Sequence, residues 1–225
     1  HMKQTAKKYG PHGRPPAGKN GDKREHILDS ALNLFAGQGI AGTTIAQVAK
    51  AAGVTPAMVH YYFTNREGLL DAIVAERLAP VIAYIWADIS EKTLNDPRRV
   101  VTELVDRLLE TVGRMPQLPF LWSREVLHAG GLLRRRVMSL IPVERFETLS
   151  RYLSGAQREG LLNARAAPAL VFISVLGVIM LPLAAQDILG RTSAGSALNR
   201  ETLRRHVLAL LLDGLCPQPE PEAKP

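Results

Sequence analysis

Five side chains that could contact DNA lie close together in one stretch of the sequence. The hydroxyl groups of Thr44 and Tyr61 and the guanidinium of Arg66 are donors of the kinds that bind phosphate oxygens. Pro56 and Ala57 are apolar and could touch the methyl groups of thymine in a major groove. Groups of these kinds position a protein on a duplex, so the stretch predicts nucleic-acid binding.

The same stretch has the signals for two short helices joined by a tight turn. Thr44 can cap the first helix, and Gln47 can reach back to the amide of the cap, as in a capping box. Gly53 follows where the chain needs a positive φ. Thr55 can cap the second helix, with Pro56 at its first position. This arrangement predicts a helix-turn-helix, which places its second helix in a major groove.

The segments on either side of this motif also read as helices. Asp22 and Glu25 form a second possible capping box, and Gly39 is the expected end of the helix that follows. Asn65 can cap a longer helix whose apolar pattern continues through Pro80, where a kink is expected. The helix-turn-helix is therefore expected to form part of a three-helix head.

Most of the positive charge lies at the N-terminus. Residues 1–24 hold seven Lys or Arg against a single Asp, a net +6 out of +7 for the whole chain. Residues 1–21 are rich in Gly and Pro and are predicted to be a disordered arm. Gly13-Arg14-Pro15 resembles the core of an AT-hook, which lays its Arg in a narrow minor groove. Two interpretations stay open, a solvated tail and an arm that contacts phosphates.

The composition favours an all-α cytoplasmic protein. The chain has 225 residues, of which 46% are hydrophobic, and its one cysteine, Cys216, excludes an intrachain disulfide. No strand-like alternation of useful length occurs, and about nine helices are expected. The expected organisation is a disordered basic arm (1–21), a helix-turn-helix domain (22–68), a helical ligand-binding and dimerisation domain (69–216) and a disordered tail (217–225).

The C-terminal part of the chain is divided by proline and glycine. Asp96 followed by proline opens a helix that should run to about Met115. A second helix is expected over 119–128. A third is expected over 132–159, kinked or split at Pro142.

Residues 166–186 carry no charge and are long enough to cross a bilayer. Pro168, Gly177 and Pro182 interrupt the segment, however, and no Trp or Tyr flanks it. An apolar helix buried on every side is the favoured interpretation. Together with an amphipathic helix over 200–215, this segment (about 168–189) could form a homodimer interface, and no membrane contact is expected.

The order and spacing of residues 31–70 resemble the TetR (tetracycline-repressor) family of bacterial transcription regulators. The matching residues are Ala31, Leu34, Phe35, Gly39, Gly42 to Thr44, Val48, Ala49, Ala52 to Thr55, Tyr62, Phe63, Asn65 to Glu67, Leu69 and Leu70. The resemblance implies a homodimer with DNA-binding heads and a domain that binds a small molecule. It further implies a repressor on a palindromic operator, released by a small, largely apolar effector.

Individual residues carry over from the family at the head. By this resemblance Thr44 is the first-helix cap near a phosphate, while Thr55, Pro56 and Ala57 begin the recognition helix. His60 stands where the family usually has Tyr, and Arg66 replaces the usual Lys. Arg66 keeps the charge and can bind a phosphate bidentately. A protonated His60 would add charge, so DNA affinity is predicted to rise as the pH falls.

The family usually places its ligand pocket among the middle helices, where large apolar and two ionisable side chains occur. Each could equally be ordinary core, and Glu125 and His128 are the sharper pair because their helix is otherwise apolar. The candidate ligand-binding residues are Trp86, Met115, Phe120, Trp122, Glu125, His128 and Met138.

Other chemistry has weaker support. Glu125 and His128 form a Glu-x-x-His step, which di-iron bundles need in two copies, and no second copy exists. No phosphate-binding glycine loop or nucleophile elbow occurs, so no cofactor, metal or catalytic residue is expected. A helical enzyme or carrier and a membrane-anchored protein are the two rival function classes.

Overall fold

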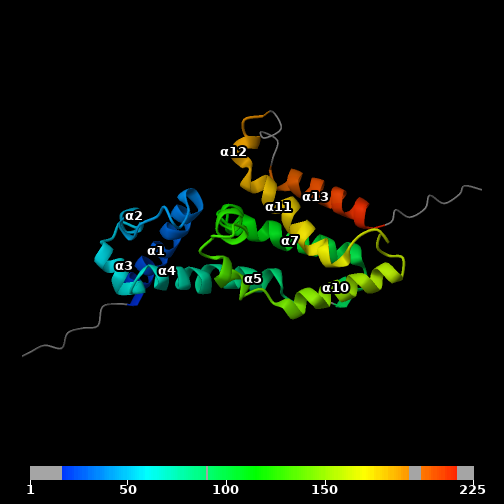
Figure 1. Cartoon of the computed structure of the whole chain (residues 1–225), viewed down its shortest axis with the longest axis horizontal. Helices are drawn as coiled ribbons and strands as arrows, with labels where there is room; N and C mark the ends of the chain where they lie inside the picture. Colours follow the sequence, from blue (N-terminus) through cyan, green and yellow to red (C-terminus); the bar gives the residue numbers. More distant parts are fainter. Residues whose placement is uncertain (1–16, 90, 193–198, 217–225) are drawn as a thin grey trace, which may run out of the picture.

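The computed structural model describes residues 17–89, 91–192 and 199–216, and every regular element in these ranges is a helix (Figure 1). The predicted all-α class is confirmed. Arg14, most of the predicted arm and the C-terminal tail lie outside the described residues. The elements are α1 (Ala17–Gln38), α2 (Ile45–Ala51), α3 (Pro56–Phe63), α4 (Arg66–Ile73), η1 (Val74–Leu78), α5 (Ala79–Ile85), α6 (Glu91–Leu94), α7 (Pro97–Arg114), α8 (Leu118–Leu121), η2 (Trp122–Leu127), α9 (Arg134–Met138), α10 (Val143–Arg158), η3 (Pro168–Leu170), α11 (Val171–Ala184), α12 (Gln186–Leu189) and α13 (Arg200–Leu215).

Helices α1 to α4 form a small head at one end of the molecule (Figure 1). Its core includes Phe35 of α1, Val59 of α3 and Leu69 of α4, each at most 1% exposed. Helix α1 ends at Gly39, whose φ of +80° suits a residue without a side chain. The predicted capping box at Asp22 is wrong, because α1 begins at Ala17 and Asp22 lies inside it. The helix thus starts within the segment predicted to be an arm.

A continuous helical run, α4–η1–α5, carries the chain from the head into the larger domain (Figure 1). The predicted disturbance at Pro80 takes the form of a π-helical turn, η1, which directly precedes α5. Proline has no N–H to donate, and its ring crowds the carbonyl four residues earlier, so a widened turn relieves the clash. The run therefore stays helical through the proline.

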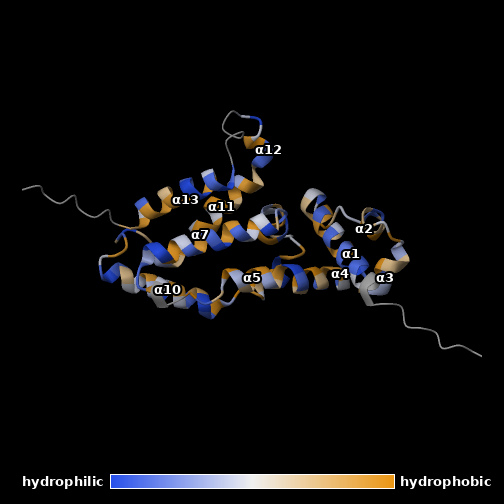
Figure 2. Ribbon diagram, turned by 180° about the vertical axis from the view of Figure 1, so that it is seen from behind, coloured by the Kyte–Doolittle hydropathy of each residue, from blue (hydrophilic) through white to orange (hydrophobic). Residues whose placement is uncertain are grey.

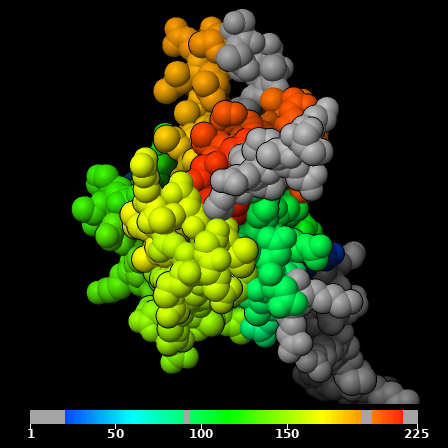
Figure 3. All heavy atoms as spheres, turned by 90° about the vertical axis from the view of Figure 1, so that its right-hand side faces the viewer, coloured from blue at the N-terminus to red at the C-terminus, as the bar shows by residue number. Residues whose placement is uncertain are grey.

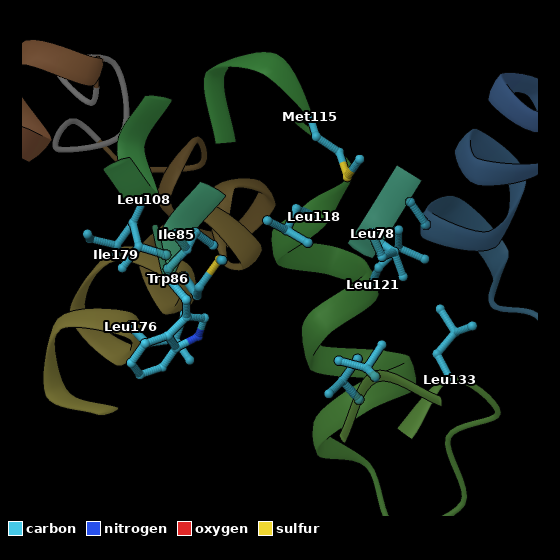
Figure 4. Packing of buried hydrophobic residues seen from close by; sticks show 14 of the residues in the cluster. Leu78, Ile85, Trp86, Leu108, Met115, Leu118, Leu121, Leu133, Leu176 and Ile179 are labelled. Atoms are coloured by element: carbon cyan, nitrogen blue, oxygen red, sulfur yellow. The ribbon is translucent and has the colours of Figure 1, made fainter. Parts of the chain in front are cut away.

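Helix α7 lies at the centre of the larger domain and contacts α5, α11 and α13. Asp96 caps it, accepting from the Arg98 amide at 2.8 Å, and Pro97 is its first residue, as predicted. The predicted long helix over 132–159 is split at Pro142 into α9 and α10. Figure 4 shows buried Leu, Ile and Trp side chains from several helices packed together, among them Leu108 of α7 and Ile179 of α11.

Helix α11 holds most of the uncharged segment, and hydrophobic residues cover much of it (Figure 2). None of the helices in the described ranges combines the length and apolarity that crossing a membrane would need. Val175 and Ile179 are fully buried, whereas Leu181 is 71% exposed. The short α12 stands out above α11 and α13 when the molecule is viewed from the end away from the head (Figure 3).

Candidate DNA-binding head and effector pocket

Two side-chain caps fix the helices of the predicted helix-turn-helix. Thr44 accepts from the amide of Gln47 at 3.2 Å, and the Gln47 side chain accepts from the Thr44 amide at 2.8 Å. Thr55 accepts from the Met58 amide at 3.3 Å and places Pro56 at the first turn of α3. Gly53 in the connecting turn has φ +63°. The predicted caps and turn are confirmed.

The outer side of α3 presents predicted contact residues to solvent. Val59 and Phe63 face the core, and because a helix turns 100° per residue, Ala57, His60 and Tyr61 point the other way. Tyr61 is 79% exposed. Its ring meets the Tyr62 ring edge-on, with centroids 5.2 Å apart, so a neighbour within the head fixes its place on the outer side of α3.

The His60 ring makes one hydrogen bond inside the head. Its Nδ1 lies 3.1 Å from the Thr64 carbonyl oxygen. A carbonyl can only accept, so the proton of the neutral ring belongs on Nδ1, and Nε2 is left as an acceptor. Nε2 gains a proton to donate only when the ring is charged. Neutral His60 therefore cannot replace a tyrosine hydroxyl as a phosphate donor through Nε2.

Arg66 is turned inward. Its guanidinium donates to the Ile40 carbonyl oxygen in the α1–α2 loop, and the residue is half-buried. Asn65 caps the helix that Arg66 begins, accepting from the Gly68 amide at 2.8 Å. A phosphate contact by Arg66 stays a prediction, and in the unbound chain this residue ties α4 to the loop before α2.

An apolar cavity of about 350 Å³ lies beneath the head, in the larger domain. All eighteen lining residues are Leu, Ile, Val, Met, Phe or Trp. Trp86 packs against Phe172 with ring centroids 4.3 Å apart and against Phe146 at 6.1 Å. In the close-up, Trp86 lies beside Leu176 of α11, with Leu118 on a neighbouring helix (Figure 4). Such a lining can bind a hydrocarbon surface but offers no partner to a buried charge.

Three of the seven candidate ligand residues, Trp86, Trp122 and Met138, line this cavity. The other four are absent from its wall, so the structure does not bring the seven together. Met115 and Phe120 pack into the core. His128 is exposed, and its Nδ1 accepts from the Gly130 amide at 3.1 Å. Helical geometry explains why Glu125 is not in the wall. Val126 faces the cavity, so its neighbour Glu125 points in another direction.

Glu125 is a buried carboxylate that joins the larger domain to the head. It is 6% exposed. Oε1 accepts from the Ile40 amide at 2.9 Å, and Oε2 accepts from the Leu132 amide at 3.1 Å. Each oxygen thus has a donor from a different segment. The two side chains of the Glu-x-x-His step are therefore engaged separately, Glu125 with the head and His128 with the Gly130 amide.

Ion pairs also connect the head to the larger domain, between α4 and α9. Arg136 of α9 donates to Asp71 and Glu67 of α4. The hydrogen bond to Asp71, followed by that to Glu67, raises the pKa of Arg136 above its ordinary value. Arg24 of α1 pairs with Glu76 of η1 and lowers the pKa of that carboxyl, chiefly through their hydrogen bond.

Comparison with known proteins gives the head a family. Residues 27–73 match the sequence model described as "Bacterial regulatory proteins, tetR family". The transcriptional regulator AcrR of Shigella flexneri is 34% identical over 90 residues, which are 40% of this chain and 41% of AcrR. The transcriptional repressor KstR2 of Rhodococcus jostii is 24% identical over 205 residues, 89% of this chain and 96% of KstR2. Over residues 27–73 the chain has the DNA-binding head of a TetR-family regulator.

The fold extends the likeness beyond the head. The structure of the ketosteroid transcriptional regulator KstR2 of Mycobacterium tuberculosis superimposes with a TM-score of 0.68 at 16% identity, covering 87% of this chain and 96% of that one. At this low identity, the likeness between the two proteins is one of fold. The match to AcrR spans less than half of that relative's length, and the matched proteins are regulators and not enzymes.

The sequence reasoning missed three residues at the boundary between the TetR head and the pocket. Ile40 is fully buried, and both of its backbone polar groups are bound by side chains from elsewhere. Arg124 donates to the Gly37 carbonyl at 2.6 Å, and Arg136 pairs with α4. Their partners are far away in the sequence, so no local pattern signals these contacts.

Proposed function

We propose that this chain is a cytoplasmic, ligand-responsive transcriptional repressor that binds a palindromic DNA operator as a homodimer. A small, largely apolar effector releases it. The single observation that carries the proposal is the outward face of α3, where Tyr61 is 79% exposed on a capped recognition helix. The repressor role follows the printed name of KstR2 of Rhodococcus jostii.

The head supplies both kinds of DNA contact. Thr44, Thr55 and Tyr61 are exposed and carry hydroxyl groups for phosphates. Pro56 and Ala57 at the start of α3 are exposed apolar groups for thymine methyls. One short helix with so few base-reading groups binds weakly alone, so two heads about one helical turn apart, ~34–36 Å, are needed.

A second copy is the partner best suited to the outer face of α11 and α13. Leu170, Ile173 and Leu181 on the α11 side and Leu210 on α13 are all more than half exposed. Gly177 on the same side of α11 has open space around it, so another helix can approach closely. Exposed apolar side chains that continue over two helices favour an isologous dimer.

The pocket favours an apolar effector without a buried charge. Its lining contains no carboxylate, amine or guanidinium, so a charged group on the effector must stay at the mouth. Leu127 and Met138 line the pocket and are also exposed, which marks where its wall meets solvent. The Mycobacterium tuberculosis neighbour is named as a ketosteroid regulator, and a steroid is a rigid, mainly hydrocarbon ligand.

DNA selection followed by a binding titration tests the proposal. A random duplex library is passed over the immobilised full chain, and enriched sequences are measured by fluorescence anisotropy. We expect a palindrome whose affinity falls steeply and linearly in log–log form with salt. Tyr61→Ala should weaken binding about tenfold, which is about 1.4 kcal/mol, while the exposed Leu161→Ala on the far domain is the matched control. Failure to enrich any duplex, or equal effects of the two variants, contradicts the proposal.

A fluorescent probe tests the effector site. The chain has two tryptophans, and both line the pocket. The neutral probe N-phenyl-1-naphthylamine should therefore quench both by energy transfer as it brightens in the apolar cavity. Met138→Glu, at the exposed edge of the wall, should weaken probe binding, and Leu161→Glu should not. If Met138→Glu leaves the probe affinity unchanged, the apolar binding site lies elsewhere.

A further inference from the structure

Ile40 stands between the pocket wall and the residue that begins α4. Its amide donates to Glu125 Oε1 at 2.9 Å, and its carbonyl accepts from the Arg66 guanidinium. The residue is fully buried, so water cannot replace either partner. Ile40 is therefore bound at the same time by Glu125, from the segment that lines the pocket, and by Arg66, a predicted DNA contact.

The π-helical turn η2 brings the pocket wall and the head contact into one six-residue segment. Trp122, Val126 and Leu127 line the cavity, whereas Glu125 reaches the head. Arg124 reaches the Gly37 carbonyl at the end of α1, 2.6 Å away. A single π turn in an α-helix is a poorer hydrogen-bonding arrangement and frequently occurs at functional sites. Displacement of the wall in this segment must displace Glu125 as well.

The surroundings leave Glu125 no room to absorb such a displacement, because Gly39 lies against its carboxylate and Gly131 against its backbone. A side chain at Gly39 would begin 3.4 Å from Glu125 Oε1. A side chain at Gly131 would begin 2.2 Å from the Glu125 carbonyl oxygen. Close packing transmits strain, and separating a buried carboxylate from its donors is costly. The α1–α2 loop therefore moves with η2 when η2 moves.

We propose that Glu125, Ile40 and Arg66 form a relay through which occupancy of the pocket changes the DNA contact of Arg66. An occupant displaces η2, Glu125 carries Ile40 with it, and the carbonyl that orients Arg66 shifts. The inference rests on the proposed function, because it takes the cavity as the effector site and Arg66 as a phosphate contact. Glu125 and Ile40 are positioning residues in this scheme.

Coupling between Arg66 and the pocket tests the relay without DNA. The affinity of N-phenyl-1-naphthylamine is measured from tryptophan quenching in the full chain and in Arg66→Ala, Glu125→Gln and the double variant. Arg66 does not line the cavity. The hydrogen bond from Arg66 to the Ile40 carbonyl keeps η2 in its empty-pocket position. Arg66→Ala should therefore tighten probe binding at least fivefold, which is the lower end of typical allosteric coupling. In the Glu125→Gln background the same change should alter it less than twofold.

Glu125→Gln is nearly isosteric, but its amide has one oxygen and can accept from only one of the two backbone donors. The matched controls are Glu147→Gln and Arg99→Ala, both exposed in the larger domain. A purely structural role for Glu125 or Arg66 would lower the urea midpoint without changing probe affinity. If Glu125→Gln does not fold, Arg66→Ala compared with Arg99→Ala decides the question alone.

The outcomes separate the relay from the proposed function. Probe binding that Arg66→Ala leaves unchanged overturns the relay and leaves the pocket intact. A probe that quenches neither tryptophan overturns the pocket and the relay together. With a selected operator in hand, reciprocity requires the probe to weaken DNA binding by the same factor by which DNA weakens probe binding. Glu125→Gln should reduce that factor to below two.

Discussion

Gly131→Ala should destabilise the chain far more than Gly130→Ala, although the two glycines are adjacent. A Cβ atom at Gly131 would lie 2.2 Å from the Glu125 carbonyl oxygen, 2.5 Å from its carbon and 2.8 Å from Cα. These are backbone atoms and cannot rotate away. At Gly130 the nearest atoms belong to the His128 ring, at 3.4 Å, and a side chain can move.

The contacts set the size of the effect. Neither glycine has φ in the left-handed region, so the difference arises from space alone. An ordinary contact begins at 3.4 Å, so the Gly131 loop must move by more than an ångström. Overpacking of this kind costs up to about 3 kcal/mol. The shift also endangers the hydrogen bond from the Leu132 amide to Glu125, worth about 1 kcal/mol or more because the acceptor is charged. The sum predicts a loss of about 3–4 kcal/mol for Gly131→Ala and within about 0.5 kcal/mol for Gly130→Ala.

Urea unfolding followed by circular dichroism measures both values, and a thermal scan should show a Tm loss of roughly 6–16 °C for Gly131→Ala. Equal stability of the two variants would refute the packing of this loop against η2. A large loss for Gly130→Ala alone would show that His128, and not the Glu125 backbone, limits the space.

Three further predictions concern the head and the dimer. Thr44→Ala removes the cap of α2, so it should lower the free energy of unfolding, measured in urea, by about 1 kcal/mol. An unchanged free energy of unfolding would mean that the capping box does not stabilise the head. With Nδ1 facing the Thr64 carbonyl, neutral His60 offers Nε2 only as an acceptor, so His60→Tyr restores a hydroxyl donor and should tighten DNA binding in anisotropy titrations. Unchanged or weaker binding would mean that this position does not contact a phosphate. Leu210→Glu places a charge on the exposed apolar face of α13, so it should convert the proposed dimer to monomers in sedimentation experiments. A dimer that persists in this variant would place the interface on another surface.

The head could be predicted closely because its signals are local. Thr44 and Gln47 are three residues apart, and Thr55 directly precedes Pro56, so each cap is legible in the sequence. The start of α1 was missed because the helix continues toward the N-terminus past Asp22, which had looked like its cap. Gly18 and Gly21 lie inside α1, so the glycine content of this segment did not mark where the helix begins.

The pocket could be predicted only in part, because helical phase and distant contacts decide it. The cluster of large side chains near Trp122 indicated the right region, and Trp86 and Met138 do line the cavity. Glu125 lies in the same turn but faces the head, and a rotation of 100° for one residue separates the two roles. Phe172 and other α11 residues complete the wall, and nothing in their apolar run distinguished pocket from interior.

The most direct test of the central claim is the number of chains bound to one operator. Native mass spectrometry of the full chain with a selected palindrome should give two chains per duplex, and a duplex with one half-site should bind far more weakly. Met138→Glu should leave this stoichiometry unchanged, because no residue that lines the pocket belongs to helices α1 to α4 of the head. One chain per duplex with equal affinity for one and two half-sites would contradict a dimeric repressor on a palindromic operator.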